Sequence, residues 1–185
     1  GRACSPAARC AARLGGRTFV LTTTLKALTL VAQAIRDMSD AGSRPLEVLV
    51  QGEEPRRSLL QHYGDGVGKV LVGSQSFWEG IDVPGEALQC VVIDKLPFAV
   101  PSDPLVQARA ESIRRAGGDP FNELQLPQAV LTLKQGVGRL IRDFEDRGLV
   151  VLGDPRLRSR PYGAKFLASL PPMPVLEDHD EALES

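Results

Sequence analysis

The sequence predicts an α/β fold with a mainly parallel, doubly wound sheet. Five short runs rich in valine, leucine and isoleucine alternate with longer stretches that have helical periodicity. Continuous apolar runs are typical of parallel strands that helices cover on both faces, whereas half-exposed strands alternate between apolar and polar residues. The regular succession of strand and helix therefore indicates three layers, with the sheet in the middle.

The expected elements follow from these runs and from the turn residues between them. The first long helical stretch carries an apolar stripe formed by Leu28, Val31 and Ile35, and Gly42 closes it. Pro127 suits the first turn of the last long helix. We expect strands at residues 18–22, 47–50, 70–72, 91–94 and 149–152, and helices at residues 25–41, 54–63, 102–116 and 127–144.

The composition is typical of a globular domain of ordinary size. Of 185 residues, 43% are hydrophobic and the net charge is −1, so the chain lacks the basic excess of a domain that grips DNA alone. A domain that lines one half of a DNA-binding groove, with another domain lining the other half, is compatible with this charge. The cysteines Cys4, Cys10 and Cys90 are scattered, which argues against a zinc or iron–sulfur site here and favours a core position for Cys90. With no apolar stretch of membrane-spanning length and no signal peptide, we expect a cytoplasmic chain without membrane contact.

Polar residues follow the first two expected strands. Ligands of parallel sheets collect at the carboxyl ends of the strands. Thr22, Thr23 and Thr24 come just before a helix, so their hydroxyls can hold a phosphate, or one of them can simply cap the helix. Gln51 follows the second strand, where it can contact a nucleic-acid backbone or belong to an ordinary turn.

The loop after the third strand is richer in such residues. Ser74 and Ser76 can donate to phosphate oxygens, and Asp82 can orient an arginine or a ribose hydroxyl. Phe77 and Trp78 can stack on a base, but two aromatic residues in this position favour a place in the core.

Charged residues end the last two strands. Lys95 can contact a phosphate from the end of the fourth strand. Asp154 and Arg156 follow the fifth strand two residues apart, and we expect them to pair with each other in a structural role.

The most specific pattern is a glutamine and two arginines within two turns of the last long helix. Gln135, Arg139 and Arg142 are spaced by four and three residues, so a helix places them on one face. An amide and two guanidinium groups that converge on one spot suit a polyanion such as a nucleoside triphosphate.

Taken in order, these segments resemble the C-terminal half of the DinG/XPD group of superfamily 2 DNA helicases, in particular its bacterial YoaA-like branch. The resemblance runs from about residue 17 to residue 172. It implies a RecA-like fold of the P-loop NTPase type. The matching segments are SQSFWEGIDVPG (74–85, motif V), DKLPF (94–98), GDPF (118–121), LPQAVLTLKQGVGRLIR (126–142, ending in motif VI), DPRL (154–157) and RPYGAKFLASL (160–170).

The resemblance also implies roles for individual residues. Arg139 and Arg142 would act as arginine fingers on the γ-phosphate of ATP, and Gln135 would sense the same phosphate. Coupling of the nucleotide to DNA would involve Glu79, Gly80, Asp82 and Gly138. Contacts with the backbone of single-stranded DNA would come from Thr22, Thr23, Gln51, Ser74, Gln75 and Ser76.

The sequence has no phosphate-binding loop of the G-x-x-x-x-G-K-[ST] type and no DEAH-type acidic box. We therefore expect ATP and Mg²⁺ to be held mainly by a missing N-terminal RecA-like domain, with any iron–sulfur cluster also in that part, and the fragment alone to be inactive. Residues 1–16 are expected to be a linker or helix from a longer chain, 17–172 the second RecA-like domain, and 173–185 a flexible acidic tail. The expected setting is a monomeric fragment of a bacterial, cytoplasmic, 5′–3′ DNA repair or replication helicase.

A different class of protein remains open at this stage. In a nucleotide- or protein-binding α/β module without motor function, Arg139 and Arg142 would only form structural ion pairs with Asp143, Glu145 or Asp146. A phosphate-binding loop encoded upstream would favour the helicase, and a stop codon just upstream would favour the module.

Overall fold

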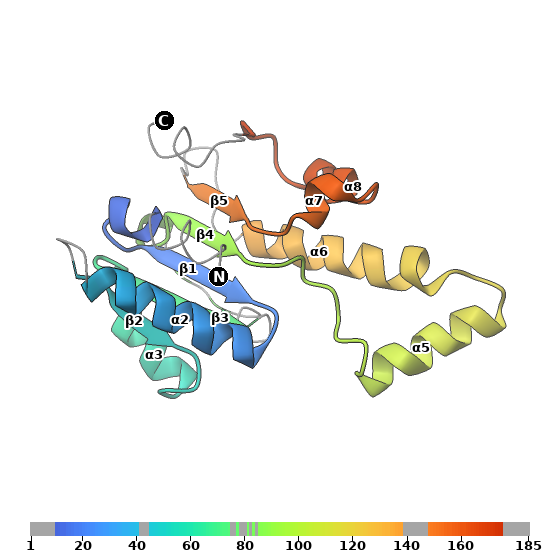
Figure 1. Cartoon of the computed structure of the whole chain (residues 1–185), viewed down its shortest axis with the longest axis horizontal. Helices are drawn as coiled ribbons and strands as arrows, with labels where there is room; N and C mark the ends of the chain where they lie inside the picture. The colour runs from blue at the N-terminus through green and yellow to red at the C-terminus, as the bar shows by residue number, and fades with distance from the viewer. Residues whose placement is uncertain are drawn as a thin grey trace.

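The computed structural model describes residues 10–40, 45–74, 77, 81, 83, 85–138 and 148–175. A parallel sheet forms the centre, and helices cover its two faces (Figure 1). The strands are β1 (Thr18–Thr22), β2 (Glu47–Val50), β3 (Lys69–Ser74), β4 (Cys90–Ile93) and β5 (Leu149–Leu152). The helices are α2 (Leu25–Asp40), α3 (Arg56–Tyr63), α5 (Pro104–Arg115), α6 (Leu126–Val137), α7 (Arg156–Ser159) and α8 (Gly163–Ser169), with short turns η1 (Gly85–Ala87) and η2 (Phe121–Gln125).

The sheet has the strand order β2-β3-β1-β4-β5, and every neighbouring pair is parallel. The prediction of a parallel, doubly wound α/β fold is therefore confirmed. All five expected strands form. β3 is longer than expected because it pairs with the whole of β1, from Thr18–Val70 to Thr22–Ser74, and begins one residue earlier against β2, at Glu47–Lys69.

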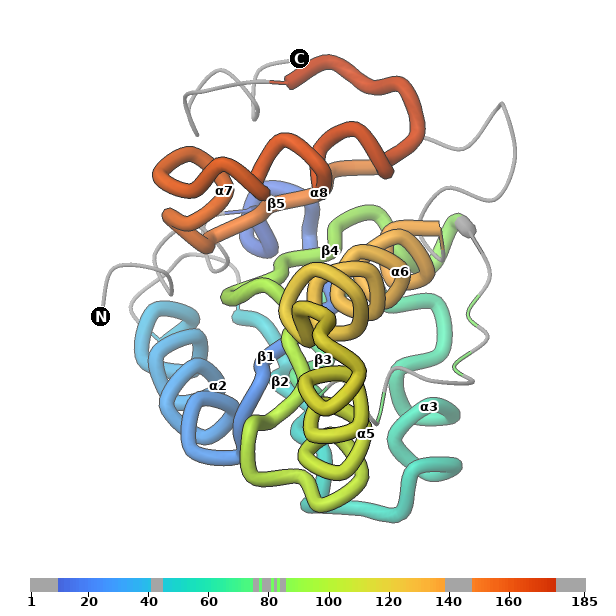
Figure 2. The backbone as a smooth tube through the Cα atoms, turned by 90° about the vertical axis from the view of Figure 1, so that its right-hand side faces the viewer, coloured from blue at the N-terminus to red at the C-terminus, as the bar shows by residue number. Residues whose placement is uncertain are grey.

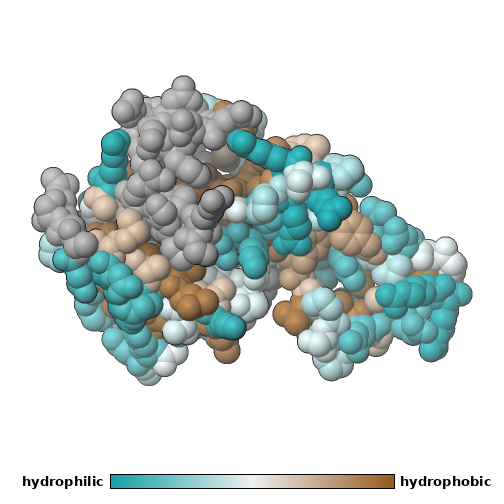
Figure 3. Space-filling view, in the orientation of Figure 1, coloured by the Kyte–Doolittle hydropathy of each residue, from teal (hydrophilic) through white to brown (hydrophobic). Residues whose placement is uncertain are grey.

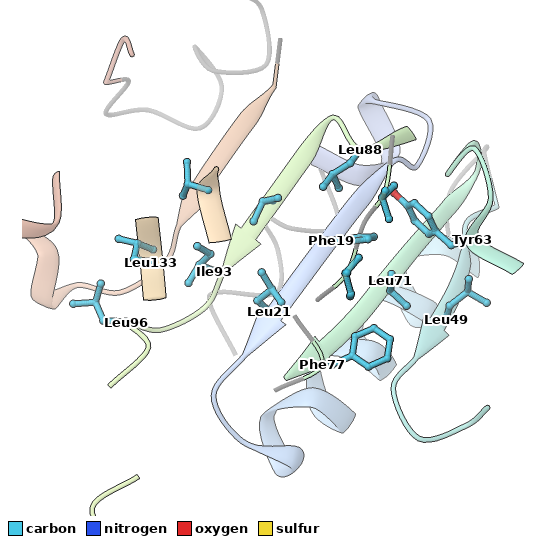
Figure 4. Packing of buried hydrophobic residues seen from close by; sticks show 14 of the residues in the cluster. Phe19, Leu21, Leu49, Tyr63, Leu71, Phe77, Leu88, Ile93, Leu96 and Leu133 are labelled. Atoms are coloured by element: carbon cyan, nitrogen blue, oxygen red, sulfur yellow. The ribbon is translucent and has the colours of Figure 1, made fainter. Parts of the chain in front are cut away.

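The two faces of the sheet bury two separate apolar clusters, because successive side chains of a strand point to opposite faces. Val20 packs with the predicted stripe of α2 and with Cys90, which is fully buried as expected. On the other face, Phe19 and Leu21 pack with residues of α3 and α6, among them Tyr63 (Figure 4). Figure 2 shows α2 on one side of the sheet and α3 and α6 on the other.

A local turn in one case and a capping hydrogen bond in the other explain why two helices begin later than predicted. The helix expected from residue 54 begins at Arg56, because the chain first turns through Gly52, whose φ is +96°, and Pro55 then starts the helix. The helix expected from residue 102 begins at Pro104, because the carboxylate of Asp103 accepts hydrogen bonds from the amides of Leu105 and Val106.

The helix α6 begins earlier than predicted and is described only to its end at Val137. A turn with wider hydrogen-bond spacing, η2, precedes it, and Asp119 accepts bonds there from the amide of Phe121 and the side chain of Asn122. Gly138 follows α6 as a turn residue, and residues 139–147 lie outside the described part of the chain. One continuous helix from residue 127 to residue 144, as predicted, therefore does not form, and the helix face expected to align Gln135 with the two arginines ends before residue 139.

An extension made of α5 and the start of α6 projects beyond the sheet (Figure 1). Its helix α5 buries only Ala110, while Val100 and Leu105 are more than half exposed. Figure 3 shows apolar patches beside hydrophilic surface on this side of the molecule. None of the helices in the described ranges is long and apolar enough to cross a bilayer.

Candidate functional site at the carboxyl edge of the sheet

Residues predicted to bind ligands come together at the carboxyl edge of the sheet. Thr22 at the end of β1 pairs directly with Ser74 at the end of β3. Gln51 follows β2, and exposed Lys95 follows β4. Because all strands are parallel, these four residues, from four strands, lie along one edge, where parallel sheets bind their ligands.

The three threonines after β1 have different positions. Thr22 is only 2% exposed, and its hydroxyl donates to the carbonyl oxygen of Thr24 at 3.3 Å. The hydroxyl of Thr24 accepts a hydrogen bond from the amide of Ala27 at 3.1 Å, so Thr24 caps α2. Thr23 is half-buried and lies between them. Thr23 is therefore better placed than Thr22 to offer a hydroxyl to a ligand.

A hydrogen bond links two of the predicted DNA-binding residues. The side-chain oxygen of Gln51 accepts from the backbone amide of Ser74 at 2.6 Å, which ties the end of β2 to the end of β3. Both side chains are partly exposed. Since the oxygen of Gln51 serves this bond, the group of Gln51 that suits a phosphate oxygen is its amide nitrogen.

The loop after β3 depends on a glycine that the sequence interpretation missed. A Cβ atom on Gly73 would lie 2.9 Å from the ring of Phe77, so only glycine lets the ring pack against the strand end. Phe77 is 6% exposed, which confirms its predicted core position, and the guanidinium of Arg56 lies 5.5 Å from its ring centre. The following residues singled out in this loop lie outside the described residues: Gln75, Ser76, Trp78, Glu79, Gly80 and Asp82.

Helix α6 presents the described part of the glutamine and arginine pattern. Leu133, Gly136 and Val137 are buried, whereas Gln135 and Gly138 are exposed. The helix thus holds Gln135 on its solvent side, next to its carboxyl end. Arg139 and Arg142 lie outside the described residues, as do the acidic residues 143, 145 and 146.

The expected pair between Asp154 and Arg156 is present. The nitrogens Nη2 and Nε of Arg156 donate to the Asp154 carboxylate at 2.6 and 3.0 Å, and the side chain of Asp154 is only 4% exposed. The amide of Leu96 also donates to Asp154, at 2.9 Å. Burial opposes ionisation of this carboxyl group, but the hydrogen bonds from Arg156 and Leu96 outweigh it and lower its pKa.

The chemistry of this edge suits binding of phosphate oxygens rather than bond making. Thr23, Gln51, Ser74 and Lys95 offer hydroxyl, amide and ammonium donors there, and the carboxylate of Asp154 at the same edge is occupied by Arg156 and the amide of Leu96. Within the described ranges, no three His, Cys, Asp or Glu side chains lie close enough to hold a metal ion. The described residues therefore do not supply the set of ligands that an iron–sulfur cluster needs.

The arrangement of the sheet and its helices is that of a RecA-like α/β domain. A solved structure of an XPD helicase superposes with a TM-score of 0.58 over 93% of this chain and 32% of that chain, at 23% identity, which shows the shared fold. A family model described as the helicase C-terminal domain matches residues 8–173. The chain therefore belongs to the helicase C-terminal domain family, of the type found in DinG and YoaA helicases.

Relatives of known name are similar over most of this chain. An ATP-dependent DNA helicase YoaA of Escherichia coli strain K12 is 53% identical over 88% of the chain, which spans 25% of that relative. An ATP-dependent DNA helicase DinG of Photobacterium profundum is 42% identical over 84% of the chain and 23% of its own length. A Bacillus subtilis relative, 38% identical over 91% of the chain and 18% of its own length, is named 3'-5' exonuclease DinG. The chain thus spans about a quarter of the first relatives' length or less.

Proposed function

We propose that the chain is the second motor domain of a longer ATP-dependent DNA helicase that moves along single-stranded DNA. The observation that carries this proposal is the meeting of Thr22, Gln51 and Ser74, from three strands, at one edge of a helicase-family domain. The backbone at Thr22 places the hydroxyl of Thr23 beside the donors of Gln51 and Ser74. Donors in a row at the ends of neighbouring strands suit the regularly spaced phosphates of a single strand.

The role of this domain in ATP hydrolysis would be to complete a site held mainly by the other RecA-like domain, which would bind ATP and Mg²⁺. Arg139 and Arg142 would stabilise the charge that develops on the γ-phosphate, and Gln135 would sense that phosphate. Gln135 is exposed near the carboxyl end of α6, which supports a role in contacting a nucleotide held by another domain. Residues of both motifs would couple the nucleotide to DNA: Glu79, Gly80, Asp82 and Gly138.

Contacts with single-stranded DNA would come from the carboxyl edge. Thr23, Gln51 and Ser74 supply the described donors, together with the backbone around Thr22. Gln75 and Ser76 would extend the row. Because the net charge of the chain is −1, binding by this domain alone is expected to be weak and sensitive to salt.

The resemblance to DinG and YoaA helicases also suggests the direction of movement, the cellular role and the location of the longer protein. We assign the longer protein a 5′ to 3′ direction of movement, a role in DNA repair or replication recovery, and a place in the bacterial cytoplasm. An iron–sulfur cluster would belong to the other part of the longer protein. The fragment itself would be monomeric.

Replacing Gln51 with glutamate in the longer protein tests the DNA contact. The glutamate keeps an oxygen that accepts from the amide of Ser74, but it replaces the donor by a negative charge that repels phosphate. We expect the concentration of single-stranded DNA that gives half-maximal ATPase stimulation to rise about tenfold, which corresponds to about 1.4 kcal/mol.

Gln33 provides a matched control for this substitution. It lies exposed on α2, where its side chain donates to Asp37, so Gln33→Glu adds the same charge away from the carboxyl edge. DNA stimulation should be unchanged in this variant. An unchanged DNA requirement in Gln51→Glu would remove Gln51 from the DNA site.

A further inference from the structure

Arg156 lies where the ends of two strands meet an aromatic cluster. Its guanidinium donates two hydrogen bonds to Asp154 and lies 5.2 Å from the ring centre of Phe98. A planar guanidinium can bind a carboxylate with two parallel bonds and cover a ring at the same time, which an ammonium group cannot do. The orientation of Arg156 is therefore fixed from two sides.

Asp154 ties this arginine to the sheet. Its carboxylate follows β5, yet it accepts a hydrogen bond from the amide of Leu96, which follows β4. The backbone amide of Arg156 also donates to it, at 2.9 Å. The ends of β4 and β5 are thus held together at the edge where ligands are expected.

The ring of Phe98 contacts both Arg156 and the residues that pack on helix α6. Phe98 stacks on Phe121 with 5.8 Å between ring centres, and Phe121 begins the turn η2 that runs directly into α6. It also meets the ring of Phe166 edge-on at 5.7 Å. Phe166 is fully buried in α8, which packs along α6. Arg156 is therefore connected to α6 at its start and along its length.

We infer that Asp154 and Arg156 are positioning residues that fix α6, and with it Gln135, relative to the carboxyl edge of the sheet. This inference rests on the proposed function, in which α6 must respond to ATP while the edge holds DNA. Asp154 is buried, whereas the side chain of Arg156 is 39% exposed. A partly exposed ion pair adds little net stability, but its two directional hydrogen bonds set one geometry. The aromatic cluster alone would attach α6 to the domain, whereas the charged pair fixes the angle at which it is attached.

The test measures how strongly nucleotide and DNA binding are coupled in the longer protein. The affinity for single-stranded DNA is measured with and without a non-hydrolysable ATP analogue, and the ratio of the two dissociation constants is the coupling. In Arg156→Lys and Asp154→Asn we expect a wild-type coupling of about fivefold or more to fall towards one, with unchanged DNA affinity in the absence of nucleotide. A loss of folded protein would lower the number of binding sites and leave this ratio unchanged.

Tyr63→Phe is the matched control for lost stability. It removes a buried hydrogen bond of 2.8 Å to the carbonyl oxygen of Ala87, at the opposite edge of the sheet, and leaves that oxygen without its partner. The control should keep the wild-type coupling. Wild-type coupling in Arg156→Lys, or equal loss in Tyr63→Phe, would overturn the inference alone. Absence of coupling in the wild-type protein would overturn the proposed function as well.

Discussion

Replacing Arg139 with alanine in the longer protein is expected to lower DNA-stimulated ATP hydrolysis by about three orders of magnitude. An arginine that enters from a second domain stabilises the charge on the transferred phosphoryl group, and losses of about 10³-fold or more are usual when such a residue is removed. Because the other domain would hold the nucleotide, ATP binding should change little. Steady-state turnover at saturating single-stranded DNA, together with the affinity for ATP, measures both effects.

Arg109 offers the control for this substitution. It is exposed on α5, and Arg109→Ala removes the same charge without touching the glutamine and arginine pattern. Turnover that survives Arg139→Ala but is lost in Arg142→Ala would move the principal role to Arg142. Full turnover in both variants would contradict the assignment of arginine fingers to this domain.

The second large effect is expected from Leu133→Ala, which should lower the free energy of unfolding by about 2–5 kcal/mol. Leu133 is fully buried where α6 packs against the sheet, in the same cluster as Ile93 and Leu96 (Figure 4). Its truncation removes apolar contacts and leaves a cavity between the helix and the sheet. Urea unfolding of the chain, followed by circular dichroism, measures the change.

A leucine two residues earlier on the same helix provides the comparison. Leu131 is 54% exposed, so Leu131→Ala should change the free energy of unfolding by about 0.5 kcal/mol or less. Equal losses in the two variants would contradict the orientation of α6.

The strands of the sheet were predicted well because each one is marked by a local pattern of apolar residues. Each strand is a continuous apolar run. A run of this kind is buried on both faces of the sheet, whichever strands pair with it. Helix ends were predicted less well, since they depend on particular hydrogen bonds and turns such as those of Asp103 and Gly52. The helices α7 and α8 were not predicted, because four and seven residues are too few to show a clear period.

The candidate site was predictable where its residues directly follow strands. Their position after strands singled out Thr22, Gln51 and Ser74, the family resemblance implied their contact with DNA, and the parallel topology brings them to one edge. The bond between Gln51 and Ser74, the fit of Phe77 on Gly73 and the contact of Asp154 with Leu96 join residues that only the fold brings together. The roles of Arg139 and Arg142 stay predictions.

Comparing ATP turnover of the isolated chain with that of the longer protein shows whether this domain completes an ATP site held mainly by another domain. Both are assayed with and without single-stranded DNA. If the ATP site is shared in this way, the isolated chain shows no turnover and the longer protein shows turnover that DNA stimulates. Turnover by the pure isolated chain, or no stimulation by DNA in the longer protein, would contradict a shared site.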